Sequence, residues 1–480
     1  MVIRRKRDPR TAQAPLPFEY QVVPDAQAAA FTAHGGLPLV LDTMRITGVS
    51  AAIEQELHFR KRQSGYSERE LLEAMVLLIA VGGECMEEIA ALGEDRALLE
   101  LLGVEKLPSP DALRAALLSF HDESKLEQAR AALGDGEKAL LVRASEPLKQ
   151  LGRVNTALIA AMNRAHPAPI ATLEADASII ESHKRQAMPH YEGGRGYQPV
   201  VVYWVEHDAI LHTEFRDGNV PAGKEPLRAL EDAVAALPSG VRRRFRGDSA
   251  FYESHMLRFL TDPTNAFERF TISADMGTDL RKLCVAAPSD AWRLLEERAN
   301  ESVWITEVVF TPGELPKNAQ PLRTIAIRFD PRQSELFDGD GNARSTKYLA
   351  IVSNDWDEDA GKLLRWHWQK AGSIERVHDV LKNELAAGVL PCAEFGANAA
   401  WFLINALTYN ILSALKTSGL PPALHDARPK RLRLRVLNLG AQLVSHARSL
   451  FARVAETLAA GVELLSVRPR LRLDYSAPSG

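Results

Sequence analysis

The pattern of apolar and polar positions along the chain predicts three kinds of region. Between residues 50 and 150, apolar residues recur at the spacing of amphipathic helices. Ser67 followed by Glu70 has the form of a capping box at a helix start, and Ser109 followed by Pro110 marks another start. Short helices joined by tight turns are compatible with a DNA-reading helix-turn-helix, and equally with an ordinary helical bundle.

From residue 168 onward, apolar and polar positions alternate instead. In the segment 169–180, the polar residues Thr172, Glu174, Asp176 and Ser178 share one face, which predicts a half-buried strand. Further elements follow in the order strand, strand, helix, strand, helix, strand, at 200–208, 210–218, 223–237, 241–251, 252–262 and 268–275.

A second group of strands interrupts this order. Strand-like segments at 303–310, 323–329 and 347–352 are separated by turns, so we expect a separate antiparallel sheet inserted over 280–352. One helix is then predicted over 363–388, ending at Gly388. The remainder reads as helical, with two short basic strands at 431–436 and 468–473.

The apolar stretch 397–415 is long enough to cross a bilayer but carries polar residues, among them Asn398, Asn405 and Asn410. Buried amides need hydrogen-bond partners, so we expect a helix packed inside the protein and no membrane partner. The three cysteines lie far apart and form no CxxC pair, which favours a reducing compartment over a disulfide framework or a structural zinc site.

The order of the elements is that of a ribonuclease H-like fold. We therefore expect an α/β ribonuclease H-like catalytic core interrupted by an antiparallel β insertion, with an all-α N-terminal domain and a mainly helical C-terminal region. The predicted divisions are a flexible basic arm at 1–25, a helical DNA-binding or dimerisation domain at 26–160, the first part of the core at 168–279, the insertion at 280–352, the second part of the core with the catalytic helix at 353–400, and a basic C-terminal region at 401–480.

Three carboxylates occupy the points of this fold that carry chemistry. Asp176 lies in the first strand, Asp248 just beyond the fourth, and Glu375 on the late helix. Converging carboxylates suit two divalent ions, Mg²⁺ or in its place Mn²⁺, which stabilise charge on both oxygens of an in-line phosphodiester cleavage. Taken singly, each acid has an ordinary alternative: a solvated strand face, a turn cap or a helix surface.

These features resemble a DDE transposase of bacterial insertion sequences, in the group with a β-strand insertion and a Tyr-Arg-Glu-Lys signature on the late helix. Glu375 and Lys382 match the signature at its spacing, and Trp368 stands in place of the Tyr. Ala371 departs from the Arg, for which Lys370 or Arg376 is a guessed substitute. The resemblance covers roughly 30–475 and includes the segments GRGYQPVVVY, RGDSAFY and NALTYNIL.

The resemblance implies an enzyme that binds the inverted-repeat ends of its own element and performs metal-dependent cleavage and strand transfer, that is, cut-and-paste transposition. Its implied partners are double-stranded DNA, both transposon ends and target, and a second copy of the chain in a synaptic complex. It also implies a bacterial cytoplasmic protein associated with the nucleoid.

Several side chains are candidates for contact with this DNA. Lys382 shares a helix face with Glu375 and is placed to reach a phosphate, although an ion pair with Asp379 is the ordinary alternative. The resemblance assigns an insertion tryptophan to base stacking, for which Trp304 is the first candidate, Trp292 and Trp204 are lesser ones, and a core position is the alternative.

The net charge alone is misleading about a nucleic-acid partner, because the charged residues are unevenly distributed along the chain. The 480 residues are 46% hydrophobic and carry a net charge of −4, which at first argues against a nucleic-acid partner. Yet residues 51–140 hold 10 basic and 18 acidic side chains, whereas residues 401–480 hold 11 basic and 4 acidic ones. Rows of Arg therefore join the candidate DNA contacts, at Arg244 and Arg246 and at Arg431, Arg433 and Arg435.

Two other functions stay open at this point. One is a non-catalytic DNA-binding protein derived from such an enzyme, against which the three intact acids count. The other is a metal-dependent nuclease of the same fold, which would cut DNA without joining it to a target. Joined products, as opposed to cut ends alone, separate the nuclease from the transposase.

Overall fold

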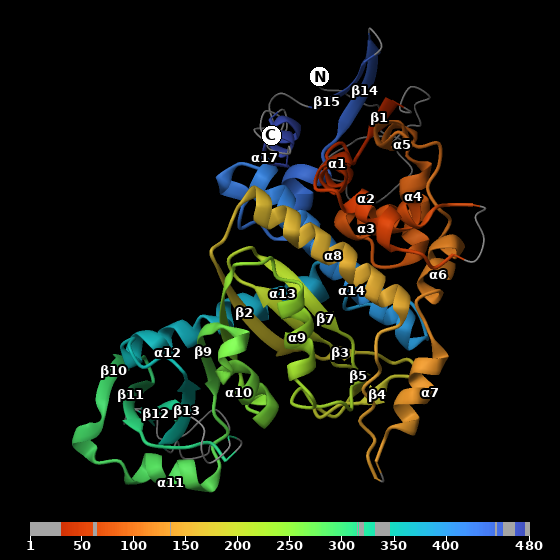
Figure 1. The fold of residues 1–480 in the computed structure, drawn as a ribbon. Coiled ribbons are helices and arrows are strands. Elements are labelled where there is room, and N and C mark those ends of the chain that lie inside the picture. Colours follow the sequence, from red (N-terminus) through yellow and green to blue (C-terminus); the bar gives the residue numbers. More distant parts are fainter. Residues whose placement is uncertain are drawn as a thin grey trace, which may run out of the picture.

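The computed structural model describes residues 30–60, 65–134, 136–313, 315, 321–331, 346–446, 449–454 and 466–475. The predicted arm at 1–25 lies outside these residues. Within them the chain is a mixed α/β protein, in which helices surround one large mixed sheet (Figure 1).

One end of the nine-stranded sheet contains the five strands predicted between residues 168 and 279. Their spatial order is β9-β8-β2-β6-β7. Strands β2, β8 and β9 run parallel to one another, whereas β6 and β7 are antiparallel to their neighbours. The bounds are β2 (Ile170–Ala177), β6 (Val200–Trp204), β7 (Ala209–Glu214), β8 (Arg242–Gly247) and β9 (Phe267–Ser273).

Strand β2 is buried on both faces, not on one as its alternation predicts. Glu174 on its polar face is fully buried, and Leu173 and Ala175 on the apolar face are buried too. The polar face is covered by α13 (Lys370–Asn383), which packs against β2. Two further helices follow the predicted pattern, α9 (Leu227–Ala235) and α10 (Ser254–Thr261).

The insertion does not form a separate sheet, so that prediction is wrong. Its strands pair antiparallel in the order β10-β11-β12-β13, and β13 then pairs with β9, Ile351 opposite Ser273. Without β13, strand β9 would be an edge strand with unpaired backbone groups, and β13 pairs with that edge. The bounds are β10 (Arg293–Glu297), β11 (Glu301–Val308), β12 (Arg323–Pro331) and β13 (Lys347–Ser353), with α11 (Thr278–Ala286) beside β13.

The predicted helix over 363–388 is two helices, α12 (Ala360–Trp368) and α13, with a break at Gln369. The guanidinium of Arg246 donates to the carbonyl oxygen of Trp366 at 2.6 Å and to the side-chain oxygen of Gln369 at 3.1 Å. Because Arg246 competes for a carbonyl that a continuous helix would use internally, the helix is interrupted there. Helix α13 also ends at Asn383, before Gly388.

The N-terminal region is helical, as predicted, and its capping box is present. Ser67 accepts a hydrogen bond from the backbone N–H of Glu70 at 3.2 Å, and Glu70 accepts one from the N–H of Ser67 at 2.7 Å. The helices are α1 (Pro38–Ile46), α2 (Val49–Glu56), α3 (Glu68–Val81), α4 (Ile89–Glu94), α5 (Arg96–Leu102), α6 (Pro110–Leu118), α7 (Glu123–Ala131) and α8 (Glu146–Ala165).

Helix α14 (Phe395–Ala414) is the buried internal helix that its composition predicts. It packs against α8, α3 and β7, and its three asparagines each bind backbone of another segment. Asn398 binds Cys392, Asn405 accepts from the N–H of Ala386 at 2.8 Å, and Asn410 accepts from the N–H of Ile210 at 2.7 Å. Among the described helices, none has the length and hydropathy needed to span a membrane.

The two basic segments near the C-terminus are helical, so their prediction as strands is wrong. Residues 429–437 form α15 (Pro429–Leu432) and a π-helical turn, Arg433–Leu437, and residues 468–473 lie in α17 (Val467–Tyr475). Alternating Arg and Leu fits either structure, and Pro429 at the first helical position decides for a helix. The strands of this region are β14 (Ala441–His446) and β15 (Ser449–Val454). Strand β14 pairs with β15 on one side and with β1 (Phe31–Thr32) on the other.

Candidate active site

The register of two parallel strands brings two of the predicted carboxylates together. Strands β2 and β8 run side by side with Glu174 opposite Arg246. Two residues further along each chain, on the same face, come Asp176 and Asp248, and their side chains interact. Both are half-buried, and Asp248 also caps the turn that follows β8 by accepting from the N–H of Ala250 at 3.0 Å.

The electrostatic setting of this pair favours a bound cation. Burial raises the pKa of both carboxyls, and the charge of Asp176 raises the pKa of Asp248 further. The ammonium of Lys370, at the start of α13, opposes this rise and lowers the pKa of each. Two adjacent carboxylates whose charged forms are disfavoured by burial are a hard-oxygen donor set of the kind that Mg²⁺ takes.

Glu375 lies at the rim of this pair. It is exposed on α13, and its charge is near enough to raise the pKa of Asp176. In the described part of the chain, no three Asp, Glu, His or Cys side chains lie close enough together to form a metal site as they stand. The structure therefore brings Asp176 and Asp248 together and leaves Glu375 adjacent, on a helix that covers the same strand.

A buried ion pair fixes α13 over the two strands. Glu174 and Arg246 are almost fully inaccessible to solvent and contact each other directly. Glu174 also accepts hydrogen bonds from the hydroxyl of Ser373 and, at 3.1 Å, from the N–H of Ile374. Burial raises the pKa of Glu174 and lowers that of Arg246, while the charge of each partner opposes these shifts. The pair thus holds the start of α13, and with it Glu375, in register with the aspartates.

The candidate DNA contacts on α13 have different surroundings. The ammonium of Lys382 donates to the hydroxyl of Ser178 at 2.8 Å, while the alternative partner Asp379 contacts Arg428 instead. Arg376 lies 3.3 Å from Asp208, on the side of α13 that faces the β6–β7 turn. Lys370 and Arg376 are the two guessed substitutes for the missing Arg. The charge of Lys370 lowers the pKa of both aspartates.

The candidate contacts on β8 and in the insertion are engaged within the protein. Arg246 is buried in the ion pair described above, and Arg244 pairs with Glu268 at 3.0 Å. Trp304 is half-buried, with the guanidinium of Arg328 over its ring at 5.2 Å. The Arg246 side chain is consequently unavailable to DNA, and one face of the Trp304 ring is covered.

The three arginines at 431, 433 and 435 do not form one row, because their segment is helical. Arg431 and Arg435 are exposed, whereas Arg433 is half-buried. Its guanidinium donates to the carbonyls of Ile79 and Ala80 at the end of α3 and to that of Glu384 after α13. A cation that binds the last carbonyls of a helix stabilises its C-terminus, so Arg433 ties three segments together.

Sequence reasoning missed one side chain beside the aspartates, His378. It is buried on α13, and its ring nitrogen Nε2 lies 3.9 Å from Oδ2 of Asp176. Burial lowers the pKa of His378 to about 3, so the imidazole is neutral at physiological pH. The sequence does contain a clue to this position. His378 follows Glu375 by three residues, and residues so spaced are neighbours on a helix.

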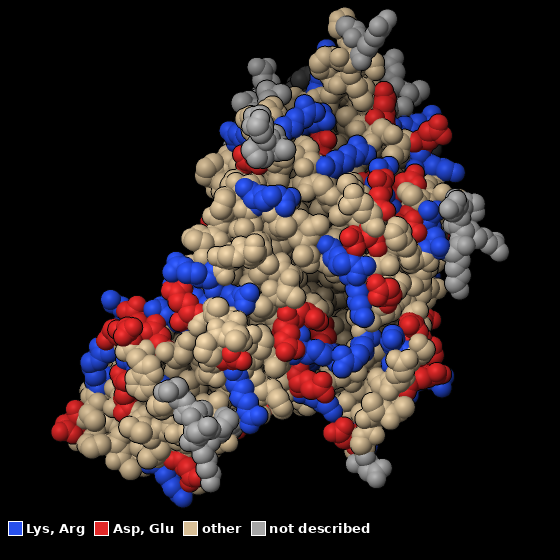
Figure 2. Space-filling model, in the orientation of Figure 1, with Lys and Arg blue, Asp and Glu red and all other residues tan. Residues whose placement is uncertain are grey.

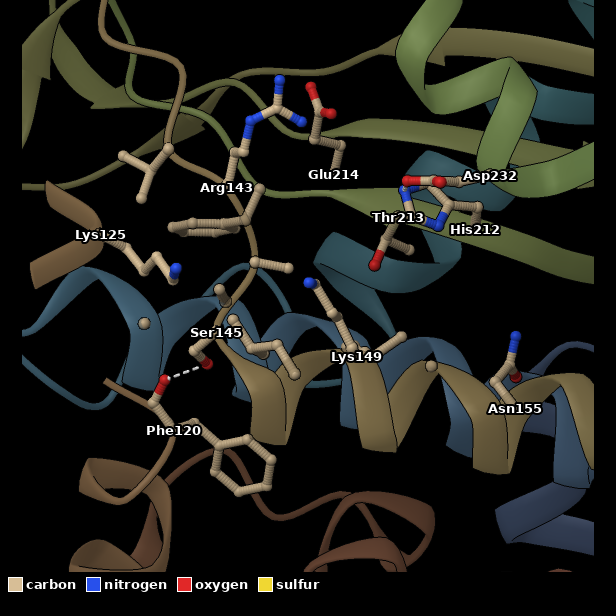
Figure 3. A pocket seen from close by; sticks show the side chains of 18 of the residues that line it. Phe120, Lys125, Arg143, Ser145, Lys149, Asn155, His212, Thr213, Glu214 and Asp232 are labelled. Carbon is tan, nitrogen blue, oxygen red and sulfur yellow. Dashed lines mark hydrogen bonds and ion pairs between the residues drawn. The ribbon is translucent and has the colours of Figure 1, made fainter. Parts of the chain in front are cut away.

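A cavity of about 600 Å³ lies away from these carboxylates, between α8, α9 and β7. Figure 2 shows the hollow on the face beside α8, with acidic and basic side chains interspersed around it. In Figure 3, Lys149 and Lys125 point toward its middle, and Glu214 and Asp232 lie on the opposite wall. Glu214 is already paired with Arg228, and His212 lies 3.6 Å from Asp232, so the lining has mixed charge.

Comparison with known proteins adds three findings. The family described as transposase DDE domain, group 1, matches residues 15–474. The search of curated proteins found no match. Among solved structures, the chain is similar to the cryo-EM structure of the piggyBac transposase synaptic complex with hairpin DNA, at 12% identity and a TM-score of 0.43, over 93% of this chain and 82% of that chain.

Proposed function

The chain belongs to the group 1 family of transposases with a DDE domain, and from that premise we propose that it is the transposase of a bacterial insertion sequence. In this proposal it binds the inverted-repeat ends of its own element as a homodimer, cleaves them and joins them to target DNA. Its place of action is the nucleoid. The observation that carries the proposal is the pair Asp176 and Asp248, side by side at the ends of adjacent parallel strands under the helix that bears Glu375.

We propose further that the central strands are a ribonuclease H-like core. The order β7-β6-β2-β8-β9, with β2, β8 and β9 parallel, supports this assignment. The domains are proposed as predicted, a helical N-terminal DNA-binding or dimerisation domain over 26–160 and a core in two parts at 168–279 and 353–400. The insertion at 280–352 lies between the two parts of the core and continues its sheet.

In this proposal Asp176, Asp248 and Glu375 hold two divalent ions, Mg²⁺ or Mn²⁺. When bound, the ions supply charge stabilisation to the attacking and leaving oxygens of the phosphodiester. The raised pKa values of the two aspartates support a cation there, because a positive charge stabilises the charged carboxylates that burial disfavours. Lys370 supplies a fixed positive charge beside them and is the proposed counterpart of the missing signature Arg.

Removing one carboxylate at a time tests the assignment. We expect Asp176→Asn, Asp248→Asn and Glu375→Gln each to abolish metal-dependent cleavage of a duplex carrying the repeats that bracket this gene. Binding of the same duplex, measured by electrophoretic mobility, survives in each variant because the DNA contacts outside the carboxylates remain. Asp379→Asn, on the same helix but paired with Arg428, is the matched control and should cleave normally.

The products of this assay also separate the competing functions. Joined strands recovered with a target plasmid indicate a transposase, and cut ends without joined products indicate a nuclease. Binding without any cleavage by the unaltered protein indicates a non-catalytic DNA-binding protein. A cleavage-competent variant at any of the three acids contradicts the site assignment.

A further inference from the structure

A small three-stranded sheet stands at the end of β2 where Asp176 lies. Its strands are β3 (Ile180–Glu181), β4 (Met188–Pro189) and β5 (Arg195–Tyr197), in the order β3-β5-β4. Strand β3 begins three residues after β2 ends, and β5 leads directly into β6, where Val201 pairs with Asp176. Chain connectivity therefore places the base of this hairpin at the end of β2 where Asp176 lies.

The base of the hairpin is fixed to its surroundings. The ammonium of Lys184 donates to the backbone carbonyls of Leu390 and Cys392, beyond α13. The N–H of Gly218 donates to the carbonyl of Gly196 at 3.0 Å, and a Cβ atom at Gly196 would lie 2.1 Å from the carbonyl oxygen of Ile180. Such close backbone packing leaves no room for the base to shift.

The tip of the hairpin is a tight turn that presents one aromatic ring. The N–H of His190 donates to the carbonyl of Gly194 at 3.0 Å, and the N–H of Gly193 donates to the carbonyl of His190 at 3.1 Å. Gly193 has φ +98°, a conformation that glycine adopts without strain. Tyr191, between them, is 77% exposed, the highest fraction of any aromatic side chain in the described residues.

Tyr191 stands on the hairpin that leaves β2 just after Asp176, within electrostatic range of the two aspartates. The pKa of its phenol is raised, first by partial desolvation, then by the neighbouring Glu192, and then by the charges of Asp176 and Asp248. The hairpin thus places an exposed aromatic ring within electrostatic range of the carboxylates.

We propose that Tyr191 is a DNA-contact residue that stacks on a nucleobase adjacent to the phosphate cleaved at Asp176 and Asp248. This assignment rests on the function proposed above. Aromatic stacking tolerates any base, which suits a site that must accept both an element end and varied target DNA. The anchored base of the hairpin holds the ring in place before DNA binds, which lowers the entropy cost of the contact.

Fluorescence of a base analogue tests the proposal directly. The probe is a linear duplex carrying the repeat that brackets this gene, with 2-aminopurine at positions next to the predicted cleavage site. Stacking on an aromatic ring quenches this base. We expect Tyr191→Ala to lose the quenching and to weaken cleavage by roughly ten- to hundredfold, the range of one base–aromatic stack. Tyr191→Phe, which keeps the ring, should retain both.

Trp356 provides the matched control. It is exposed by 56% and follows β13 near the start of β9, the end of the sheet opposite the carboxylates, so Trp356→Ala should change neither signal. If the unaltered protein cleaves the duplex but Tyr191→Ala keeps full quenching and rate, the stacking role is wrong while the transposase function stands. If the unaltered protein neither binds nor cleaves, the proposed function fails and this inference fails with it.

Discussion

At the scale of single residues, a buried carboxyl outside the candidate site gives a pH-dependent prediction. Burial raises the pKa of Asp217 to about 6, from 3.8, and the charge of Arg130 opposes this only in part. The folded protein therefore keeps a proton that the unfolded chain releases near pH 4. The contribution of this protonated carboxyl to the free energy of unfolding is fully present below pH 4. It is lost as the pH rises through about 6, where the folded protein releases the proton.

We expect Asp217→Asn to raise the free energy of unfolding by about 1–3 kcal/mol at pH 7.5 and to leave it unchanged near pH 4. Urea unfolding at both pH values measures this difference. Asp290→Asn, at an exposed position, is the control and should have little effect at either pH. An equal gain at pH 4 and pH 7.5 would show that loss of the buried charge is not the cause.

The buried pair Glu174–Arg246 gives a prediction that concerns both stability and cleavage. Glu174→Gln leaves the guanidinium of Arg246 buried without its counter-charge, at a cost of about 3–5 kcal/mol. The variant should also cleave more slowly, because Ser373 and Ile374 lose their ionised acceptor and the start of α13 loosens.

Urea unfolding and a cleavage assay measure these two effects. The double replacement Glu174→Met, Arg246→Leu should recover much of the stability, because it leaves no unpaired charge. By contrast, Glu296→Gln breaks only the exposed pair with Arg298 and should cost under about 1 kcal/mol. If Glu174→Gln costs no more than Glu296→Gln, the buried pair does not hold α13.

At the scale of elements, two side-chain amides take the place of a further strand at the edge of the sheet. Asn155 of α8 donates to the carbonyls of Ile210 and Leu211 in β7, and Asn410 of α14 binds both the N–H and the carbonyl of Ile210. The two amides also bind each other at 2.8 Å. Backbone groups of β7 that no strand satisfies are therefore paired inside the core.

We expect Asn410→Ala to destabilise the protein by about 1–3 kcal/mol, because it leaves buried backbone groups of Ile210 without a partner. Thermal unfolding of Asn410→Ala, Asn155→Ala and the double variant should show that the two effects are not additive, since the amides share partners. Thr408→Val, on the same helix, removes only a local bond to Ile404 and should be close to neutral. Full additivity would mean that the amides act independently.

Local periodicity predicts most of these elements but not how they join. The strand predicted over 169–180 follows from alternation and is found at 170–177, and α14 follows from an apolar run whose polar members were expected to need partners. The pairing of β13 with β9 and of Glu174 with Arg246 depends on strand register between residues distant in sequence, which periodicity does not report. The break at Gln369 depends on that same register, because Arg246 produces it.

The candidate site shows the same division. Asp176 and Asp248 were predicted from their places in the order of elements, and the structure brings them together. Arg246 and Arg433 were predicted as DNA contacts from charge runs, yet both bind carbonyl groups of other segments. A run of charge in the sequence contains no information about burial, so it does not distinguish a surface cation from one that ties helices together.

At the scale of the whole molecule, the N-terminal helices and the C-terminal region share one core. A single cluster of buried apolar side chains extends from Leu37 to Leu471. Helix α14 packs on α3 and α8, and Arg433 binds the end of α3. The N-terminal helices thus pack around a helix that the chain supplies more than 200 residues later.

A fragment of residues 30–166 should therefore not fold by itself. Without α14, the apolar faces of α3 and α8 have no partner, so we expect helical content without a cooperative thermal transition and with binding of a hydrophobic dye. Calorimetry of the fragment and of the full chain measures this difference. A sharp transition in the fragment, like that of an independent domain, would contradict the shared core.

The join between β13 and β9 makes the strands of residues 280–352 an extension at one margin of the sheet. Strands β10 to β13 pair with one another and reach the remaining strands only through β9. The backbone pairs among β9, β8, β2, β6 and β7 include no residue of 280–352, so the register that brings Asp176 and Asp248 together uses no backbone pair from that margin.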